Sequence, residues 1–212
     1  MRYRQEQGFT IVELMIATVV FSVILLMTLG GFLQIGRTFY KGMTISRTEN
    51  TIRSIADSLS IDIRASQVAV ATTTKTSASD NRILYFCIGN HVYYFMRGVI
   101  FDNDPINNPK NDFGLRRGDV TSACADPISP GNSPTNIQEL LGQKMRVSKL
   151  NVTCSSIAIN RLCELDIHIA YGDNQLLDNP QADNALCKGA TAGTQFCATA
   201  DINTSILRGG SS

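Results

Sequence analysis

The chain has 212 residues and a formal net charge of +1, with 43% hydrophobic and 17% charged residues. This length fits one globular domain with an anchor or a long appendage, and the composition supplies enough apolar residues for a core. The near-zero net charge excludes a strongly basic or acidic chain, so nothing in these totals points to nucleic acid as a partner.

The first forty residues contain an apolar segment of membrane-spanning length. It opens with "GFTIVELMIA" at residues 8–17 and continues through Leu33, whereas a bilayer needs about 20 apolar residues per helical span. Basic residues flank the segment on both sides: Arg2, Arg4, Arg37 and Lys41. The sequence therefore predicts a membrane helix or a processed signal.

Two positions distinguish this segment from a simple anchor. A secretory signal peptide has a shorter apolar centre that is followed by its cleavage site, but here Gly8 stands before the apolar segment begins. Glu13 lies inside the segment, where an acidic side chain costs about 2.5–3.5 kcal/mol on insertion scales. Because such a charge is expensive and usually functional, we expect Glu13 to have a cationic partner.

The segment "GFTIVELMIA" resembles the signal of type IV pilins and of the related pseudopilins of type II secretion and competence systems. In that family a short basic leader ends in Gly, a prepilin peptidase cuts after it, and the new N-terminal residue, usually Phe, is N-methylated. The resemblance implies a leader of residues 1–8 ending at Gly8 and a mature N-terminus at Phe9. It also implies that Glu13 pairs with the Phe9 amine of a neighbouring subunit.

The helix is expected to continue beyond the membrane segment. Ile52, Ile55, Leu59 and Ile63 recur at steps of three and four residues, which is typical of one buried helix face. We expect a helix from Phe9 to about Ser66, and the Gly30–Gly31 pair is where it could bend, since Gly weakens a helix interior. The predicted regions are a leader (1–8), a transmembrane and assembly helix (9–36), the amphipathic half of the helix (37–67) and a β-rich head (68–212).

The head begins with a polar linker at residues 71–81 and continues with four predicted strands. Their β-branched and aromatic content predicts strands at 82–89, 91–101, 143–154 and 163–172. Gly89-Asn90 predicts a hairpin turn, residues 102–136 read as a long surface loop, and 136–141 as a short helical turn. The fold class is α+β: a long N-terminal helix, membrane-inserted in its first half, packed on an antiparallel sheet. The pilin resemblance implies the same architecture.

Six cysteines in the head indicate disulfides rather than a metal site, because their number is even and none forms a CxxC pair. Six cysteines allow about 15 connectivities, so the sequence leaves the pairing open. Cys154 and Cys163 flank a short connection between strands, and Cys187 and Cys197 bracket a Gly-containing loop. The remaining pair would be Cys87 and Cys124.

Candidate chemistry is sparse, and no cofactor or catalytic site is expected. Cys87 and His91 lie four residues apart, but no third group orients the histidine, so a turn histidine beside a disulfide is favoured over a nucleophile. Asp102, Asp104 and Asp112 form a weak calcium candidate without EF-hand spacing.

Five basic residues could form a surface for DNA, although a generally charged surface is favoured because acidic residues are nearly as numerous in the chain. They are Arg116, Arg117, Lys144, Arg146 and Lys149.

The resemblance implies a structural subunit, not an enzyme: a minor pilin or pseudopilin that primes filament assembly. Four segments resemble J-type minor pseudopilins: "LSIDIRAS", "YFMRGVIF", "ELLGQKMRVSKL" and "LDIHIAYGDNQLL". Expected partners are other pilins, the prepilin peptidase, the inner-membrane assembly platform and, before assembly, membrane lipid. The expected location is the cytoplasmic membrane with an extracytoplasmic head, then a filament. The alternatives are a tip adhesin or DNA-binding pilin on the same scaffold, or a membrane-anchored enzyme or sensor.

Overall fold

A computed structural model describes residues 9–66, 71–103, 112–120, 124–155, 162–189 and 193–209. The chain divides into two compact units, residues 1–40 and 41–212. The predicted leader with Gly8, and Asp104 of the calcium candidate, lie outside the described residues.

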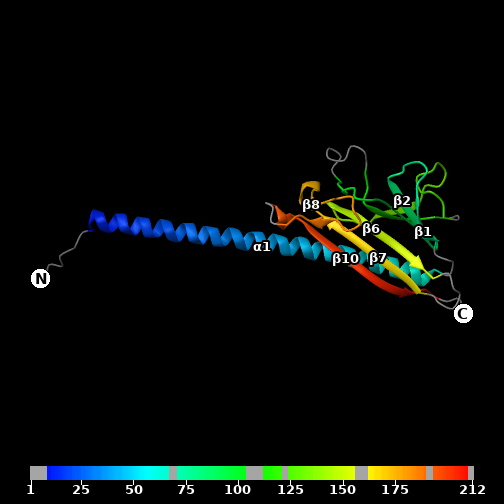
Figure 1. Cartoon of the computed structure of the whole chain (residues 1–212), viewed down its shortest axis with the longest axis horizontal. Helices are drawn as coiled ribbons and strands as arrows, with labels where there is room; N and C mark the ends of the chain where they lie inside the picture. Colours follow the sequence, from blue (N-terminus) through cyan, green and yellow to red (C-terminus); the bar gives the residue numbers. More distant parts are fainter. Residues whose placement is uncertain are drawn as a thin grey trace. The chain divides into compact units, whose positions relative to one another are not determined.

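Helix α1 extends from Ile11 to Ala65, within two residues of the predicted helix at each end (Figure 1). Its 55 residues include Gly30 and Gly31, and the helix is continuous through both. The bending expected at these glycines therefore stays a prediction. In the first unit, every large apolar side chain from Phe9 to Phe39 is exposed.

The second half of α1 buries one face. Ile52, Ile55, Leu59 and Ile63 are each at most 2% exposed, which confirms the predicted amphipathic face. Asp62 is also buried on this face, although the sequence pattern gave no sign of it.

The head contains two main antiparallel sheets rather than one. The larger sheet is a meander in which neighbouring strands are also consecutive in sequence. Its strands are β1 (Ala71–Thr76), β2 (Ile83–Ile88), β3 (His91–Met96), β4 (Leu115–Asp119) and β5 (Thr135–Glu139). Ile88 pairs with His91, so Gly89-Asn90 forms the predicted two-residue hairpin turn, and Gly89 has a φ of 57° that suits glycine.

The second sheet has the order β10-β7-β6, and its strands run side by side in Figure 1. They are β6 (Met145–Cys154), β7 (Leu162–Tyr171) and β10 (Ala198–Leu207). Short elements between β7 and β10 are η1 (Asn174–Leu176), β8 (Leu177–Asp178), β9 (Leu186–Cys187) and η2 (Thr194–Phe196). Strands β8 and β9 pair with each other.

The main core joins the buried face of α1 to one face of each main sheet. Phe86 and Tyr93 come from the larger sheet, and Leu165 and Ile167 from the smaller one. The alternate residues of β2 and β3 form a second apolar cluster, in which Tyr85, Tyr94 and Phe113 are buried. Because both faces of β2 and β3 are covered, these strands read as almost continuous apolar runs.

Three predictions about the head were wrong. Residues 71–76 of the supposed linker form β1, the supposed loop at 102–136 contains β4, and the supposed helical turn at 136–141 is largely β5. Strand β10 was not predicted. Strands β1, β4 and β5 are largely polar and lack the apolar alternation on which the predictions depended; every residue of β5 is at least partly exposed. Strand β10 does alternate, with Ala200 and Ile206 buried, so this signal was present in the sequence.

Candidate functional site

The N-terminal end of α1 carries a hydrogen-bonded cap built from Thr10 and Glu13. The Glu13 amide donates to Thr10 Oγ1 at 3.3 Å, and the Thr10 amide donates to Glu13 Oε2 at 3.0 Å. The Thr10 hydroxyl also donates to Glu13 Oε2 at 2.9 Å. This is a capping box, in which two otherwise unpaired helix amides are satisfied reciprocally. The Glu13 carboxylate is thus hydrogen-bonded within its own chain.

The part of α1 that lies in the first unit, residues 11–40, presents apolar side chains on all sides. Within the described part of the chain, α1 is the helix that is long and apolar enough to cross a membrane. A helix that is apolar all round needs lipid or other helices to cover it. Glu13 lies at one end of this surface, and the segment has the properties of a membrane anchor.

The head is crosslinked by three disulfides, and they join the same pairs that the sequence favoured. Cys87–Cys124, Cys154–Cys163 and Cys187–Cys197 have Cα–Cα distances of 5.7, 3.9 and 5.8 Å. Cys124 packs against the apolar cluster on the second face of the larger sheet, so the first disulfide ties a loop over that face. Cys87 is therefore a structural cysteine.

A buried ionic cluster joins α1 to the larger sheet at Asp62. Arg117 on β4 donates from Nε to Asp62 Oδ2 at 2.9 Å and from Nη2 to Oδ1 at 3.1 Å. The Tyr93 hydroxyl donates to Oδ2 at 2.6 Å. His91 lies at the edge of the cluster: its Nδ1 is 2.8 Å from Asp119 Oδ1, and its Nε2 is 3.8 Å from Asp62 Oδ1.

The cluster shifts the proton affinity of its members. Burial, and then the hydrogen bond to Asp62, raise the pKa of Tyr93, so this hydroxyl stays a donor. The hydrogen bond to Asp62 raises the pKa of Arg117. Hydrogen bonds from Asn136 and then His91 lower the pKa of Asp119. These groups hold the helix on the sheet, and a hollow of about 320 Å³ lined by Asp62, Ser66 and His91 adjoins them.

The five basic residues considered for DNA binding have partners within the head. Four form ion pairs: Arg116 with Glu139, Arg117 with Asp62, Lys144 with Asp173 and Lys149 with Asp166. The fifth, Arg146, is fully buried. Their placement fits a charged surface with internal pairing.

Arg146 has a structural role that could not be inferred from its position in the sequence. Its Nη1 donates to the Gly98 carbonyl at 3.3 Å and to the Asn174 side chain, and its Nη2 donates to the Gly172 carbonyl. Burial lowers the pKa of its guanidinium to about 10, while Asp173 acts in the opposite direction. Arg146 therefore links the segment after β3 to the segment after β7.

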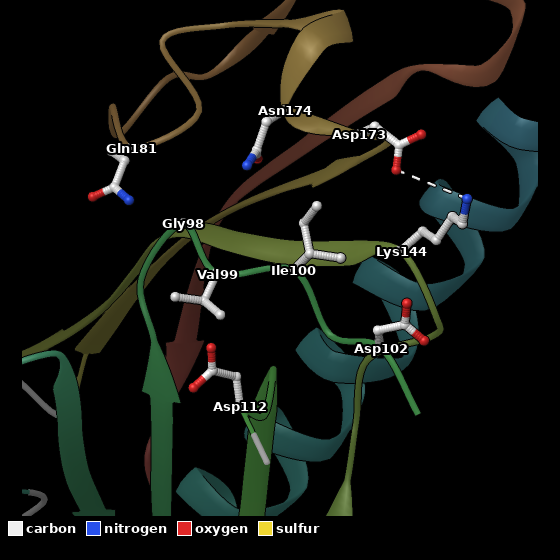
Figure 2. Close-up of a pocket in the computed structure, with 9 residues that line it drawn as sticks. All are labelled: Gly98, Val99, Ile100, Asp102, Asp112, Lys144, Asp173, Asn174 and Gln181. Carbon is white, nitrogen blue, oxygen red and sulfur yellow. Dashed lines mark ion pairs between the residues drawn. The ribbon is translucent and has the colours of Figure 1, made fainter. Parts of the chain in front are cut away.

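A hollow with a volume of about 540 Å³ lies beside these segments (Figure 2). Asp102 and Asp112 of the calcium candidate both line it, together with Asp173, which pairs with Lys144 at 3.8 Å. Among the described residues, however, no group of three His, Cys, Asp or Glu side chains is placed to hold a metal ion. The calcium candidate gains no support here.

The described fold is a pilin-like α+β architecture with an apolar N-terminal helix. A family model described as "Prokaryotic N-terminal methylation motif" matches residues 3–29. This match supports a structural subunit of the type IV pilin or pseudopilin kind, indicates a non-enzymatic class and, with the apolar helix, indicates membrane anchoring. Comparisons with curated proteins and with solved structures gave no match.

Proposed function

We propose that the chain is the precursor of a subunit of a type IV pilus, type II secretion or competence filament. A prepilin peptidase removes residues 1–8 by cutting after Gly8, and Phe9 becomes the methylated N-terminus. Residues 9–36 then anchor the protein in the cytoplasmic membrane with the head outside, and residues 37–67 connect this anchor to the head. The main support is the methylation motif at residues 3–29 followed by an uncovered apolar helix.

The test is the N-terminal residue of the protein from cells with and without the prepilin peptidase, by intact mass and N-terminal sequencing. We expect N-methylated Phe9 only where the peptidase is present. Gly8→Val should leave the leader attached, because the bulkier residue blocks cleavage, whereas Gly30→Ala, a glycine inside α1, should be processed normally. An intact Met1 in both strains would contradict the proposal and favour the membrane-anchored enzyme or sensor.

Within the filament we propose the role of a minor subunit that takes part in initiation. The support is the resemblance of four segments in α1, β3, β6 and β7 to J-type minor pseudopilins. Its partners would be other pilins and the assembly platform in the inner membrane. Quantitative mass spectrometry of purified filaments should find this chain far below the major pilin, and its deletion should reduce the number of filaments. Equal abundance of the two chains would instead make it a major subunit.

We further propose that Glu13 guides assembly by pairing with the Phe9 amine of a neighbouring subunit. The capping box supports this role because it keeps the Glu13 carboxylate hydrogen-bonded in the membrane-inserted monomer, before assembly. A neighbouring amine then adds the opposite charge. The Glu13 charge is thus compatible with the membrane before assembly and becomes fully compensated in the filament.

A further inference from the structure

A groove in the second unit lies between α1 and the segment closed by the Cys187–Cys197 disulfide. Its volume is about 510 Å³. We call it the lysine groove, and the lining side chains that matter here are Lys41, Ile45, Lys188, Thr194 and Thr199.

Local bonds fix the walls of the lysine groove. The Cys187–Cys197 disulfide joins the two ends of one wall. The Thr44 hydroxyl donates to the Gln195 carbonyl at 3.3 Å and thereby attaches this wall to α1. The Lys188 amide donates to the Leu176 carbonyl at 2.8 Å. The groove is therefore formed before any ligand binds.

The lysine groove is cationic. No Asp or Glu is among its lining residues, and within the described part of the chain neither Lys41 nor Lys188 has a carboxylate within 4.0 Å. Lys144 and Lys149 differ, since each forms an ion pair. The charges of the groove are thus available to an anion from outside the chain.

Exposed apolar side chains accompany these charges. Leu186 immediately precedes Cys187 and is 56% exposed, and Phe196 immediately precedes Cys197 and is 47% exposed. Lysines beside exposed leucine and phenylalanine are typical of surfaces that bind at the interface of an anionic membrane.

One residue of the groove is close in sequence to the proposed membrane segment. Lys41 follows residue 36, the end of the proposed membrane segment, by five residues, and five residues of helix span about 8 Å. The headgroup layer on each side of the hydrocarbon core is about 5–8 Å thick. The length of chain between Lys41 and the proposed membrane segment is thus comparable to the thickness of one headgroup layer.

We infer that the lysine groove binds the headgroup phosphate of an anionic phospholipid in the bilayer that anchors α1. This inference rests on the membrane anchoring in the proposed function and adds a defined lipid class and site to it. Lys41 and Lys188 would contact the phosphate, the threonine hydroxyls would donate to its oxygens, and Leu186 and Phe196 would lie against the glycerol and upper acyl region. The lipid would hold the head at the membrane surface until the subunit is extracted into a filament.

The test uses the full-length mature chain in nanodiscs made of phosphatidylcholine alone or of equimolar phosphatidylcholine and phosphatidylglycerol. Hydrogen exchange is followed in peptides that cover residues 186–189 and 193–199, and protease protection of residues 9–36 reports insertion. We expect exchange in these peptides to be slower with phosphatidylglycerol. The Lys41→Gln/Lys188→Gln variant should lose this difference, with each lysine worth on the order of 5-fold in lipid affinity.

Lys75→Gln is the matched control, because Lys75 is an exposed lysine of β1 outside the groove, and this variant should keep the difference. Inorganic phosphate added to the phosphatidylcholine nanodiscs should have no effect; protection by phosphate alone would overturn the lipid as the source of the anion. Equal exchange in both nanodiscs, with residues 9–36 protected, would overturn the inference and leave the proposed function intact. Failure of the chain to insert into either nanodisc would contradict the membrane anchoring itself.

Discussion

Asp62 shows how a single buried charge can fix the position of a helix on a sheet. Its carboxylate is 7% exposed and accepts hydrogen bonds from Arg117 and Tyr93, so both oxygens are satisfied. Apolar contacts alone allow a helix to shift along a sheet, whereas a bidentate Arg–carboxylate pair favours one position of the helix on the sheet. At the residue scale, Asp62 therefore selects the register in which α1 packs.

Removing this carboxylate should be strongly destabilising. In Asp62→Ala the Arg117 guanidinium and the Tyr93 hydroxyl lose their acceptor, and we expect a loss of about 3–5 kcal/mol in the free energy of unfolding, by analogy with other broken buried pairs. Asp57→Ala is the control, because Asp57 is exposed on the same helix. Urea unfolding monitored by circular dichroism measures both variants. Equal, small losses would mean that the cluster contributes little to stability.

His168 should make the stability of the head depend on pH. It is buried, and burial lowers its pKa, while Asp201, Asp166 and Asp183 act in the opposite direction and Lys149 acts with burial. The unfolded state then binds a proton more readily than the folded state. The contribution of neutral His168 to the stability of the folded state is complete above the pKa of an unfolded histidine, about 6.5. This contribution is lost as the pH falls through the lower pKa of His168 in the folded state.

The measurement is the urea midpoint between about pH 7.5 and pH 5.5, where histidines titrate. We expect a midpoint that falls on acidification in the unmodified protein and falls less in His168→Gln. Parallel curves for the two proteins would place the pH dependence elsewhere in the head.

At the scale of elements, α1 offers a direct comparison between its buried and exposed faces. Leu59 is fully buried in the core, while Ile61, two residues later, is 66% exposed. Leu59→Ala should cost about 2–5 kcal/mol because it removes buried methyl groups and leaves a cavity. Ile61→Ala should leave the monomer almost unchanged. Thermal and urea unfolding would show this difference, and similar losses in both variants would contradict the packing of α1 described above.

The disulfides should differ in their contributions. Cys87 and Cys124 are 37 residues apart, whereas Cys187 and Cys197 are 10 apart. Since a longer closed loop restricts the unfolded chain more, replacing both cysteines of the first pair by Ala should cost about 4 kcal/mol, and replacing the second pair about 3 kcal/mol. Denaturant unfolding of the two double variants tests the order. A larger loss for the Cys187–Cys197 variant would contradict this loop-entropy argument.

The elements that the sequence predicted correctly are those whose residues face the core. Helix α1 and strands β2, β3, β6 and β7 carry apolar periodicity, because one or both faces are buried. Strands β1, β4 and β5 were missed because their side chains are largely polar, whereas β10 was missed although Ala200 and Ile206 alternate and face the core. In β4, for instance, Arg116 and Arg117 serve ion pairs with residues far away in the sequence. Such partners depend on the tertiary fold and leave no local pattern.

The residues proposed for processing and assembly lie in a short motif that can be read directly from the sequence. The Asp62 cluster, the burial of Arg146 and the lysine groove could not be predicted in this way, since each joins segments that are distant along the chain. Thr10 and Glu13 are the exception among the structural contacts. Their T-x-x-E spacing is a recognisable capping-box signal in the sequence.

At the scale of the whole molecule, the role proposed for Glu13 predicts that anchoring and assembly can be separated. Glu13→Ala should insert into the membrane normally but enter filaments poorly, because the neighbouring Phe9 amine would lose its partner. Glu13→Gln keeps the size and polarity of the side chain and should show the same defect if the charge itself is required. Membrane fractionation and immunoblots of sheared filaments measure the two steps, and normal incorporation of both variants would refute the role of Glu13.

The placement of the crosslinks also determines how the molecule responds to force. No cysteine precedes Cys87, so no disulfide can join α1 to either sheet. The second half of α1 is held on the head by its apolar face and by the bonds at Asp62. In the proposed filament, tension that enters through residues 9–40 would load this non-covalent contact. The second half of α1 would detach from the head before the disulfide-linked strands separate. The sheets would stay folded, so the helix could pack on them again once the tension ends.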